Sequence, residues 1–135
     1  MKEVEKAYAG KIRMVQRQFP LSFHQRARAS AEAALCAADQ GQFWLYADKL
    51  FSNQQNLEDA DLQKYAEELK LDLGEFGQCL SNHKYAAQID RDIADGNRYG
   101  VRGTPAYFVN GRFLSGAQPI SNFVEVIDEE LARKK

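Results

Sequence analysis

The stretch "GTPAYFVNGRFLSGAQP", residues 103–119, decides which fold we expect. A Thr-Pro corner leads into four apolar residues, an Asn-Gly pair and a second short apolar run. Asn-Gly is the preferred sequence of a type I′ turn, in which both central residues have a positive φ. The stretch therefore predicts a β-hairpin over 106–115, followed by a helix with Pro119 as its first residue.

The peptide bond before Pro105 is a candidate for the cis isomer. Proline has no N–H to donate to a strand ladder, so within sheets it is confined to edges and to the first residue of a strand. Only about 5–6% of X-Pro bonds in folded proteins are cis. From the residues alone, a trans proline that begins a strand is therefore the more frequent arrangement, and both isomers stay open.

Upstream of the corner, apolar residues recur at helical spacing and predict a series of helices. These five helices lie within residues 24–40, 43–51, 62–69, 72–80 and 85–100. In the second of them the aromatic side chains, Trp44 and Phe51 included, are expected in the core. Asp72 and Glu75 have the spacing of a capping box at the start of the fourth.

Two shorter segments precede these helices. Met1, Val4 and Tyr8 share one face of a short helix that ends at Gly10. Residues 11–19 are apolar on both faces, a pattern that is typical of an interior strand.

The order of these elements predicts the fold class. A short helix and a strand come first, five helices follow, and a hairpin and a last helix complete the chain. This order predicts an α+β fold, in which a helical insertion at about 24–100 interrupts a small sheet. With 135 residues the chain has the size of one domain, and we expect a single domain over 1–135.

Three stretches of the chain carry a resemblance to a known family. They are "FPLSFHQRARASAEAALCAADQGQFWLYADKLF" (19–51), "EFGQCLSNHKYA" (75–86) and "GVRGTPAYFVNGRFLSGAQP" (100–119). Together they resemble the DsbA family of thiol–disulfide oxidoreductases, which has a thioredoxin fold with a helical insertion. The element order predicted above agrees with that fold.

The resemblance implies a role for Gly103, Thr104 and Pro105. It implies that Pro105 is cis and that this loop faces the redox centre of the family. There the backbone around Thr104 would pair with an extended substrate peptide and hold its cysteine for exchange. An extended peptide or protein substrate is thus the expected partner.

The family's redox centre is a Cys-x-x-Cys at the head of its first helix, just after its first strand. This sequence contains no Cys-x-x-Cys. We therefore expect a chain that lacks the first strand of the thioredoxin motif, holds no catalytic residue and is inactive alone. The alternative is a non-enzymatic domain that binds peptides or itself. In that case a second protomer could donate the missing strand and form a homodimer.

Cys36 and Cys79 stand 43 positions apart. In a reducing compartment two buried free thiols are the usual state, and in an oxidising one a structural disulfide is favoured. The resemblance supports the structural disulfide, because some exported members of the family pair cysteines at such positions. A zinc site with His24 and His83 is disfavoured, since His24 stands about 18 Å along a helix from Cys36. We expect no metal and no cofactor.

Charge and composition limit the remaining functions. The formal net charge is −1, with acidic and basic residues interleaved, so we expect no nucleic-acid partner. No apolar run approaches the roughly 18 residues that cross a bilayer, and we expect no membrane partner. The first ten residues, "MKEVEKAYAG", lack the apolar core of a signal peptide. The sequence does not indicate a cellular compartment, although members of the DsbA family, which it resembles, are often periplasmic.

Overall fold

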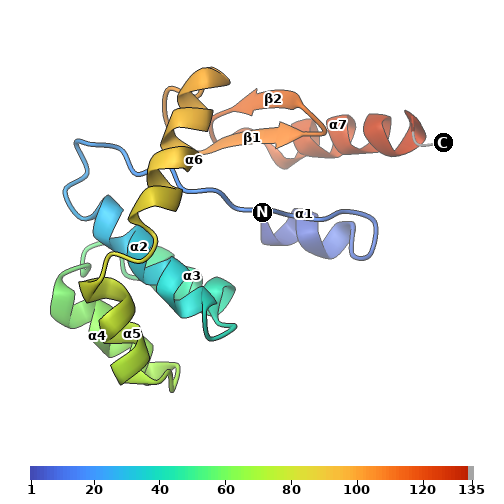
Figure 1. Ribbon diagram of the computed structural model, residues 1–135. Coiled ribbons are helices and arrows are strands. Elements are labelled where there is room, and N and C mark those ends of the chain that lie inside the picture. The colour runs from blue at the N-terminus through green and yellow to red at the C-terminus, as the bar shows by residue number, and fades with distance from the viewer. Residues whose placement is uncertain (134–135) are drawn as a thin grey trace. The chain divides into compact units, whose positions relative to one another are not determined.

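The computed structural model describes residues 1–133, which form two compact units (Figure 1). Unit 1 consists of Met1–Arg17 and Gly96–Lys135, and unit 2 consists of Gln18–Asp95. Unit 2 covers most of the helical insertion expected at about 24–100. The α+β class predicted from the sequence is confirmed: residues 1–133 contain helices and a small antiparallel sheet.

The elements follow the predicted order, with one exception described below. Unit 1 contains α1 (Lys2–Ala7), β1 (Ala106–Val109), β2 (Arg112–Ser115) and α7 (Ile120–Arg133). Unit 2 contains α2 (Ala27–Ala38), α3 (Phe43–Ser52), α4 (Asp59–Glu68) and α5 (Leu73–Ser81). Helix α6 (Ala86–Arg98) begins in unit 2 and ends in unit 1.

The predicted hairpin is confirmed. Asn110 and Gly111 have φ values of 48° and 87°, as a type I′ turn requires. Strands β1 and β2 are antiparallel, and Val109 stands opposite Arg112. Helix α7 begins at Ile120, one residue later than predicted, so Pro119 lies just before its first turn.

The core of unit 1 joins α1, α7 and one face of the hairpin. Its buried members are Val4, Tyr8, Phe123 and Ile127, with side chains of both strands packed against them. The Tyr8 hydroxyl donates a hydrogen bond to the Asp128 carboxylate at 2.7 Å. This hydrogen bond, with a contribution from burial, raises the pKa of Tyr8. A short helix that packing alone would hold weakly is thereby fixed to α7.

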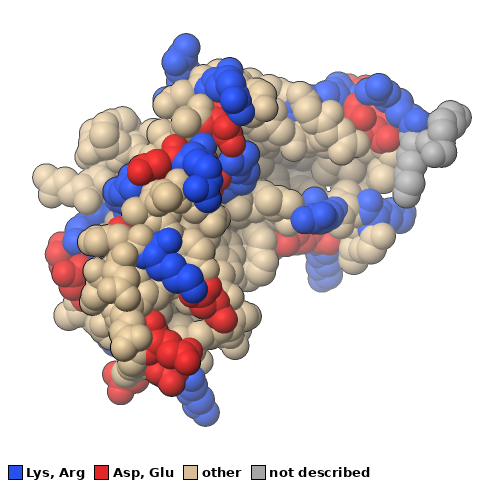
Figure 2. All heavy atoms as spheres, in the orientation of Figure 1, with Lys and Arg blue, Asp and Glu red and all other residues tan. Residues whose placement is uncertain are grey.

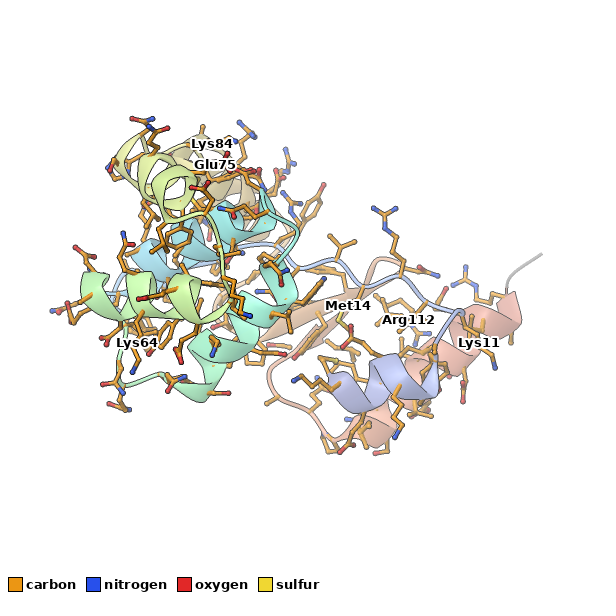
Figure 3. The ribbon with its side chains drawn as sticks, turned by 90° about the horizontal axis from the view of Figure 1, so that it is seen from below. Lys11, Met14, Lys64, Glu75, Lys84 and Arg112 are labelled. Atoms are coloured by element: carbon orange, nitrogen blue, oxygen red, sulfur yellow. A yellow bond between two sulfur atoms is a disulfide. The ribbon has the colours of Figure 1, made fainter. Side chains whose placement is uncertain are left out.

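Residues 11–19 do not form the predicted strand, and residues 13–20 have no regular secondary structure. Within residues 1–133, β1 and β2 pair only with each other, so this segment has no neighbour in a ladder. Ile12 packs against the core of unit 1 and Met14 is half-buried (Figure 3), whereas Val15 is 63% exposed. The face of this segment that contains Ile12 and Met14 is thus partly buried, and the face that contains Val15 is exposed. The apolar pattern does not reflect pairing with a strand on each side.

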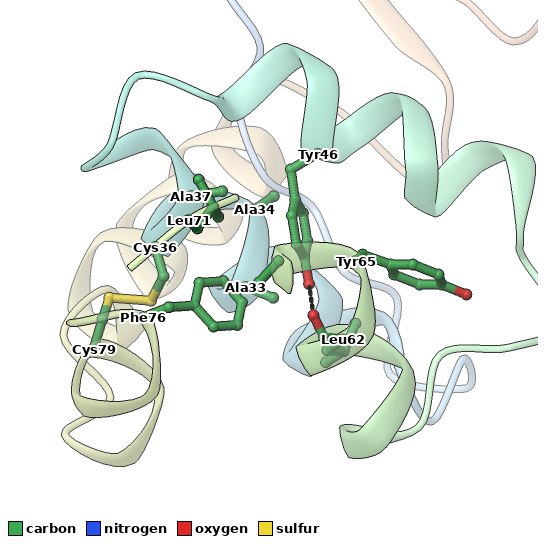
Figure 4. Packing of buried hydrophobic residues seen from close by; sticks show 11 residues of the cluster. Ala33, Ala34, Cys36, Ala37, Tyr46, Leu62, Tyr65, Leu71, Phe76 and Cys79 are labelled. Atoms are coloured by element: carbon green, nitrogen blue, oxygen red, sulfur yellow. Dashed lines mark hydrogen bonds between the residues drawn. A yellow bond between two sulfur atoms is a disulfide. The ribbon is translucent and has the colours of Figure 1, made fainter. Parts of the chain in front are cut away.

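Unit 2 is built around the alanine-rich helix α2. Small side chains such as Ala33 and Ala37, both 0% exposed, let the neighbouring helices approach closely (Figure 4). Tyr46 of α3 fills this space, and its hydroxyl donates to the backbone oxygen of Leu62 at 2.8 Å. Its ring lies 5.6 Å from that of Phe76, which is also fully buried. The buried hydroxyl is therefore satisfied within the core.

The capping box predicted at Asp72 and Glu75 is half formed, because the Asp72 N–H donates to the side-chain oxygen of Gln40 at 2.7 Å and not to Glu75. Asp72 caps α5, since its carboxylate accepts a hydrogen bond from the Glu75 N–H at 2.9 Å. The expectation for α3 was partly wrong, because Trp44 and Phe51 are 47% and 64% exposed. The helix has two apolar stripes, and only the stripe that contains Tyr46 faces α2.

Replacing Gly77 by alanine should raise the free energy of unfolding by about 0.5–1 kcal/mol. Gly77 lies in the interior of α5, and a Cβ there would meet no atom within 4 Å. Urea unfolding of the Gly77→Ala variant measures the effect. Gly41→Ala is the matched control: its φ of 74° suits glycine, so it should lose stability although its Cβ also meets nothing. A loss at Gly77 would contradict the helix placement.

Candidate functional site

The Thr-Pro corner begins where helix α6 ends. Gly100 has a φ of 88°, and its N–H donates to the Asn97 oxygen at 3.2 Å. The N–H of Val101 donates to the Gly96 oxygen at 2.9 Å. This is a Schellman motif, which satisfies the last carbonyls of a helix through a glycine in the left-handed conformation. Val101 is buried and anchors the chain directly before the corner.

Gly103, Thr104 and Pro105 form the corner between α6 and β1. The Thr104–Pro105 peptide bond is cis. Thr104 and Pro105 are exposed and Gly103 is half-buried. A Cβ added to Gly103 would meet no atom within 4 Å. The backbone of the corner is therefore accessible to a partner segment.

The corner continues into a free strand edge. The Gly116 N–H donates to the Pro105 oxygen at 2.9 Å, so these two residues form a hydrogen-bonded pair. Because hydrogen-bonded and non-hydrogen-bonded pairs alternate in an antiparallel ladder, the backbone groups of Ala106 and Phe108 point away from β2. Within residues 1–133 the sheet has only two strands, and this edge of β1 has no paired neighbour.

The two faces of the hairpin differ. Tyr107, Val109 and Leu114 pack against the core of unit 1. Phe108 and Phe113 stand opposite each other on the other face, with ring centroids 4.9 Å apart. They are 47% and 42% exposed. The outer face of the hairpin is thus an uncovered aromatic surface beside the corner.

A disulfide joins the two cysteines of the chain, both of which precede the corner in the sequence. Cys36 of α2 and Cys79 of α5 form a disulfide, with their Cα atoms 5.8 Å apart. Their exposed fractions are 1% and 8%, which limits attack by an external thiolate. The bond is structural, as the resemblance implied.

A polar cluster lies beside the disulfide at the end of α2. The Asp39 carboxylate accepts hydrogen bonds from Lys84, at 2.7 Å, and from the Tyr85 hydroxyl. Burial on its own raises the pKa of Asp39, but these hydrogen bonds outweigh it and the pKa is lowered. Asp39, Lys84 and Glu75 line a hollow in unit 2 together with both cysteines. Lys84 and Glu75 are labelled in Figure 3.

The structure keeps the predicted residues in two separate groups. Gly103–Pro105 lie in unit 1, and the disulfide lies in unit 2. Among residues 1–133 no group of three metal-binding side chains comes together. His83 pairs instead with Glu32 at 2.9 Å, and His24 contacts the ring of Phe23.

The sequence reasoning missed the aromatic outer face of the hairpin. A signal was present, since the two-residue period of strands places Phe108 and Phe113 on one face once the Asn-Gly turn sets the register. It also missed the cluster around Asp39, whose partners Lys84 and Tyr85 lie 45 and 46 positions away from it. No local pattern connects such residues.

Residues 1–129 match the family described as Thioredoxin. The chain belongs to the thioredoxin family. This membership relates it to thiol–disulfide oxidoreductases and agrees with its α+β architecture.

Three relatives of this thioredoxin-family chain have names that point to ion transport. "Na(+)/H(+) antiporter NhaA 3" of Salinispora tropica is 44% identical over 102 residues, which are 75% of this chain and 16% of the relative. "Na(+)/H(+) antiporter NhaA" of Herminiimonas arsenicoxydans is 34% identical over 87% of this chain and 18% of the relative. "Na(+)/H(+) antiporter NhaA 1" of Mycolicibacterium gilvum is 31% identical over 93% and 21%.

The chain therefore spans 16–21% of the length of these curated relatives. Within residues 1–133, no helix combines the length and the apolar character that crossing a bilayer demands.

Removing the disulfide should lower the stability of unit 2. Closing a loop of 43 residues contributes about 4 kcal/mol in the chain-entropy account. We expect the Cys36→Ala, Cys79→Ala double variant to lose most of this free energy in urea unfolding. Reducing the unchanged chain should give a similar loss, which controls for the lost sulfur atoms. A loss below about 1 kcal/mol in both would contradict a stabilising role.

The Asp39 cluster should make stability depend on acid pH. Because the pKa of Asp39 is lower in the folded state, its contribution is complete above about pH 4 and is lost as the pH falls through the folded pKa. The Asp39→Asn variant should therefore lose less stability than the unchanged chain between about pH 5 and pH 2. Equal pH dependence of the two unfolding curves would contradict the shift.

Proposed function

We propose that this chain is the substrate-holding part of a DsbA-like thiol–disulfide exchange domain. The segment that it holds is extended, carries a cysteine and lies along Gly103, Thr104 and Pro105. One observation carries the proposal: an exposed backbone corner continues directly into the unpaired edge of β1. A segment can therefore pair with the corner and the strand without any rearrangement of the hairpin.

Pairing at this edge follows the physics of strand addition. The free N–H and C=O groups of Ala106 and Phe108 can form hydrogen bonds to an added strand. Such main-chain hydrogen bonds do not depend on the amino-acid sequence of that strand. The adjacent corner has no side chain at Gly103 to obstruct the added segment. Exposed, unpaired edges of this kind are uncommon in isolated proteins, because they invite association.

The chain's own cysteines do not supply the thiolate for exchange. Cys36 and Cys79 are bonded to each other and buried in unit 2. In our proposal the disulfide belongs to a cysteine pair on another polypeptide segment: the thiolate of the held cysteine attacks one sulfur of that pair, the other sulfur leaves as a thiolate, and residues 1–135 contribute binding only. The chain alone is then expected to bind peptides without turning them over.

The names of the relatives suggest where this activity is used. We propose that the chain functions as a thioredoxin-family domain of a longer protein that resembles Na⁺/H⁺ antiporters. The observation in favour is identity of 31–44% to three such proteins over three quarters or more of this chain. Transport itself is not assigned to these residues. Sequencing the gene on both sides of this reading frame tests the proposal, and a frame without antiporter-like sequence would contradict it.

Amide spectra of the chain with a bound peptide test the holding function. The probe is a short uncharged peptide with serine in place of its cysteine, so that only binding is observed. We expect the amide signals of Ala106 and Phe108 to shift and their hydrogen exchange to slow. The signals of Tyr107 and Val109, whose amides already bond to β2, should change little.

Gly103→Val provides the matched perturbation. Its branched side chain occupies the open space over the corner, and we expect at least tenfold weaker peptide binding at unchanged thermal stability. Ala132→Val, on the exposed side of α7, should bind like the unchanged chain. Unweakened binding by Gly103→Val would contradict the proposed site. If the Ala106 and Phe108 signals shift with protein concentration alone, a second copy occupies the edge.

A further inference from the structure

The near-neutral net charge of the chain conceals two units of opposite charge. Both signs occur on the face shown in Figure 2, in agreement with the total of −1. Counted by unit, unit 1 has eleven lysines and arginines and six acidic residues, a net charge of +5. Unit 2 has seven basic and thirteen acidic residues, a net charge of −6. The unit that carries the corner is therefore the basic one.

The stretch of unit 1 that carries the corner contributes to this positive charge. Residues 96–124, which include the corner and both strands, contain three arginines and no acidic residue. Arg112 is paired with Glu129 and Glu130 of α7. Arg102 is exposed and forms no ion pair or hydrogen bond with any described residue. Its Cα lies two residues from Thr104, hence within about 7.6 Å of it.

Aromatic rings lie on the same stretch of chain. Tyr99 is 59% exposed, and its ring centroid is 6.3 Å from that of Phe108. Phe108 in turn stacks on Phe113. The Arg98 guanidinium lies 5.1 Å from the centroid of the Tyr99 ring. Three exposed rings, those of Tyr99, Phe108 and Phe113, thus form one continuous apolar surface on the same stretch of chain as Arg102.

We propose that the segment held at the corner is acidic and carries apolar side chains at alternate positions. This inference rests on the proposed function and names the class of its substrate. Side chains of a strand paired with β1 alternate between its faces, so every second one lies beside Phe108 on the aromatic outer face. A carboxylate near the corner meets Arg102. The occupant is a segment of a client protein with this alternation.

The charges argue against a second copy as the occupant. A second copy paired through the same edge would bring together two segments that contain arginines and no acidic residues. The like charges of these segments would repel each other. A client segment with glutamate or aspartate removes this repulsion. Exposed ion pairs contribute little in salt, so each carboxylate should strengthen binding by up to about fivefold at low ionic strength.

Three peptides of equal length and equal apolar residues test the inference by fluorescence anisotropy with the full 135-residue chain. One carries two glutamates, one two glutamines and one two lysines. At low salt we expect the acidic peptide to bind at least about fivefold more tightly than the neutral one, and the basic peptide most weakly. The preference should shrink as salt rises.

Arg102→Glu should abolish the preference for the acidic peptide and leave the neutral peptide's affinity within about twofold. Lys6→Glu, an equal charge change on the exposed side of α1, should preserve most of the preference. Phe108→Ser should weaken all three peptides if the rings provide contact area. Circular dichroism of each variant separates these effects from unfolding.

The outcomes that would overturn the inference differ from those that overturn the proposed function. Equal affinity for acidic and neutral peptides would refute the acidic preference and leave the holding site in place. Failure of every peptide to bind would refute the holding site itself. A single-stranded oligonucleotide that binds as tightly as the acidic peptide would show a general anion surface and overturn the assignment of a client peptide.

Discussion

The Asn110–Gly111 turn sets the register of the hairpin, and the candidate site depends on that register. A two-residue turn makes Val109 and Arg112 a pair, so Tyr107 faces α7 while Phe108 faces outward. The same alternation directs the amides of Ala106 and Phe108 away from β2. A shift of one residue would bury the outer rings, expose the inner ones and exchange which amides remain unpaired. Location, chemistry and accessibility of the edge thus follow from two residues with positive φ.

The main stabilising features belong to unit 2, and the candidate binding surface belongs to unit 1. Unit 2 has a dense core around α2, a disulfide and a charged cluster at Asp39. Unit 1 has a smaller core, and its hairpin is covered on one face only. A free strand edge is more easily tolerated when the larger core lies in a different unit, because occupancy of the edge then changes no part of that core.

Local features were predictable from the sequence, and features that depend on distant partners were not. The hairpin and the Asp72 cap follow from residues within a few positions of each other. The prediction of a strand at 11–19 was wrong because a strand forms only beside a second strand that accepts and donates its hydrogen bonds. An apolar pattern does not reveal whether such a neighbour exists. The predicted burial of Trp44 and Phe51 was wrong because helical spacing reveals an apolar stripe but does not show whether another element covers it. The cysteine pairing stayed open on the residues alone, and the charge separation was hidden by a total close to zero.

The disulfide has a mechanical consequence when the two ends of the chain are pulled apart. Residues 37–78, including α3 and α4, lie inside a covalent loop closed by Cys36 and Cys79. Tension applied through the two ends of the chain passes across the sulfur–sulfur bond and bypasses this loop. About 140 Å of backbone contour is thereby withheld from stretching, at roughly 3.3–3.6 Å per residue. A force on the two ends of this chain therefore leaves α3 and α4 unextended inside the closed loop.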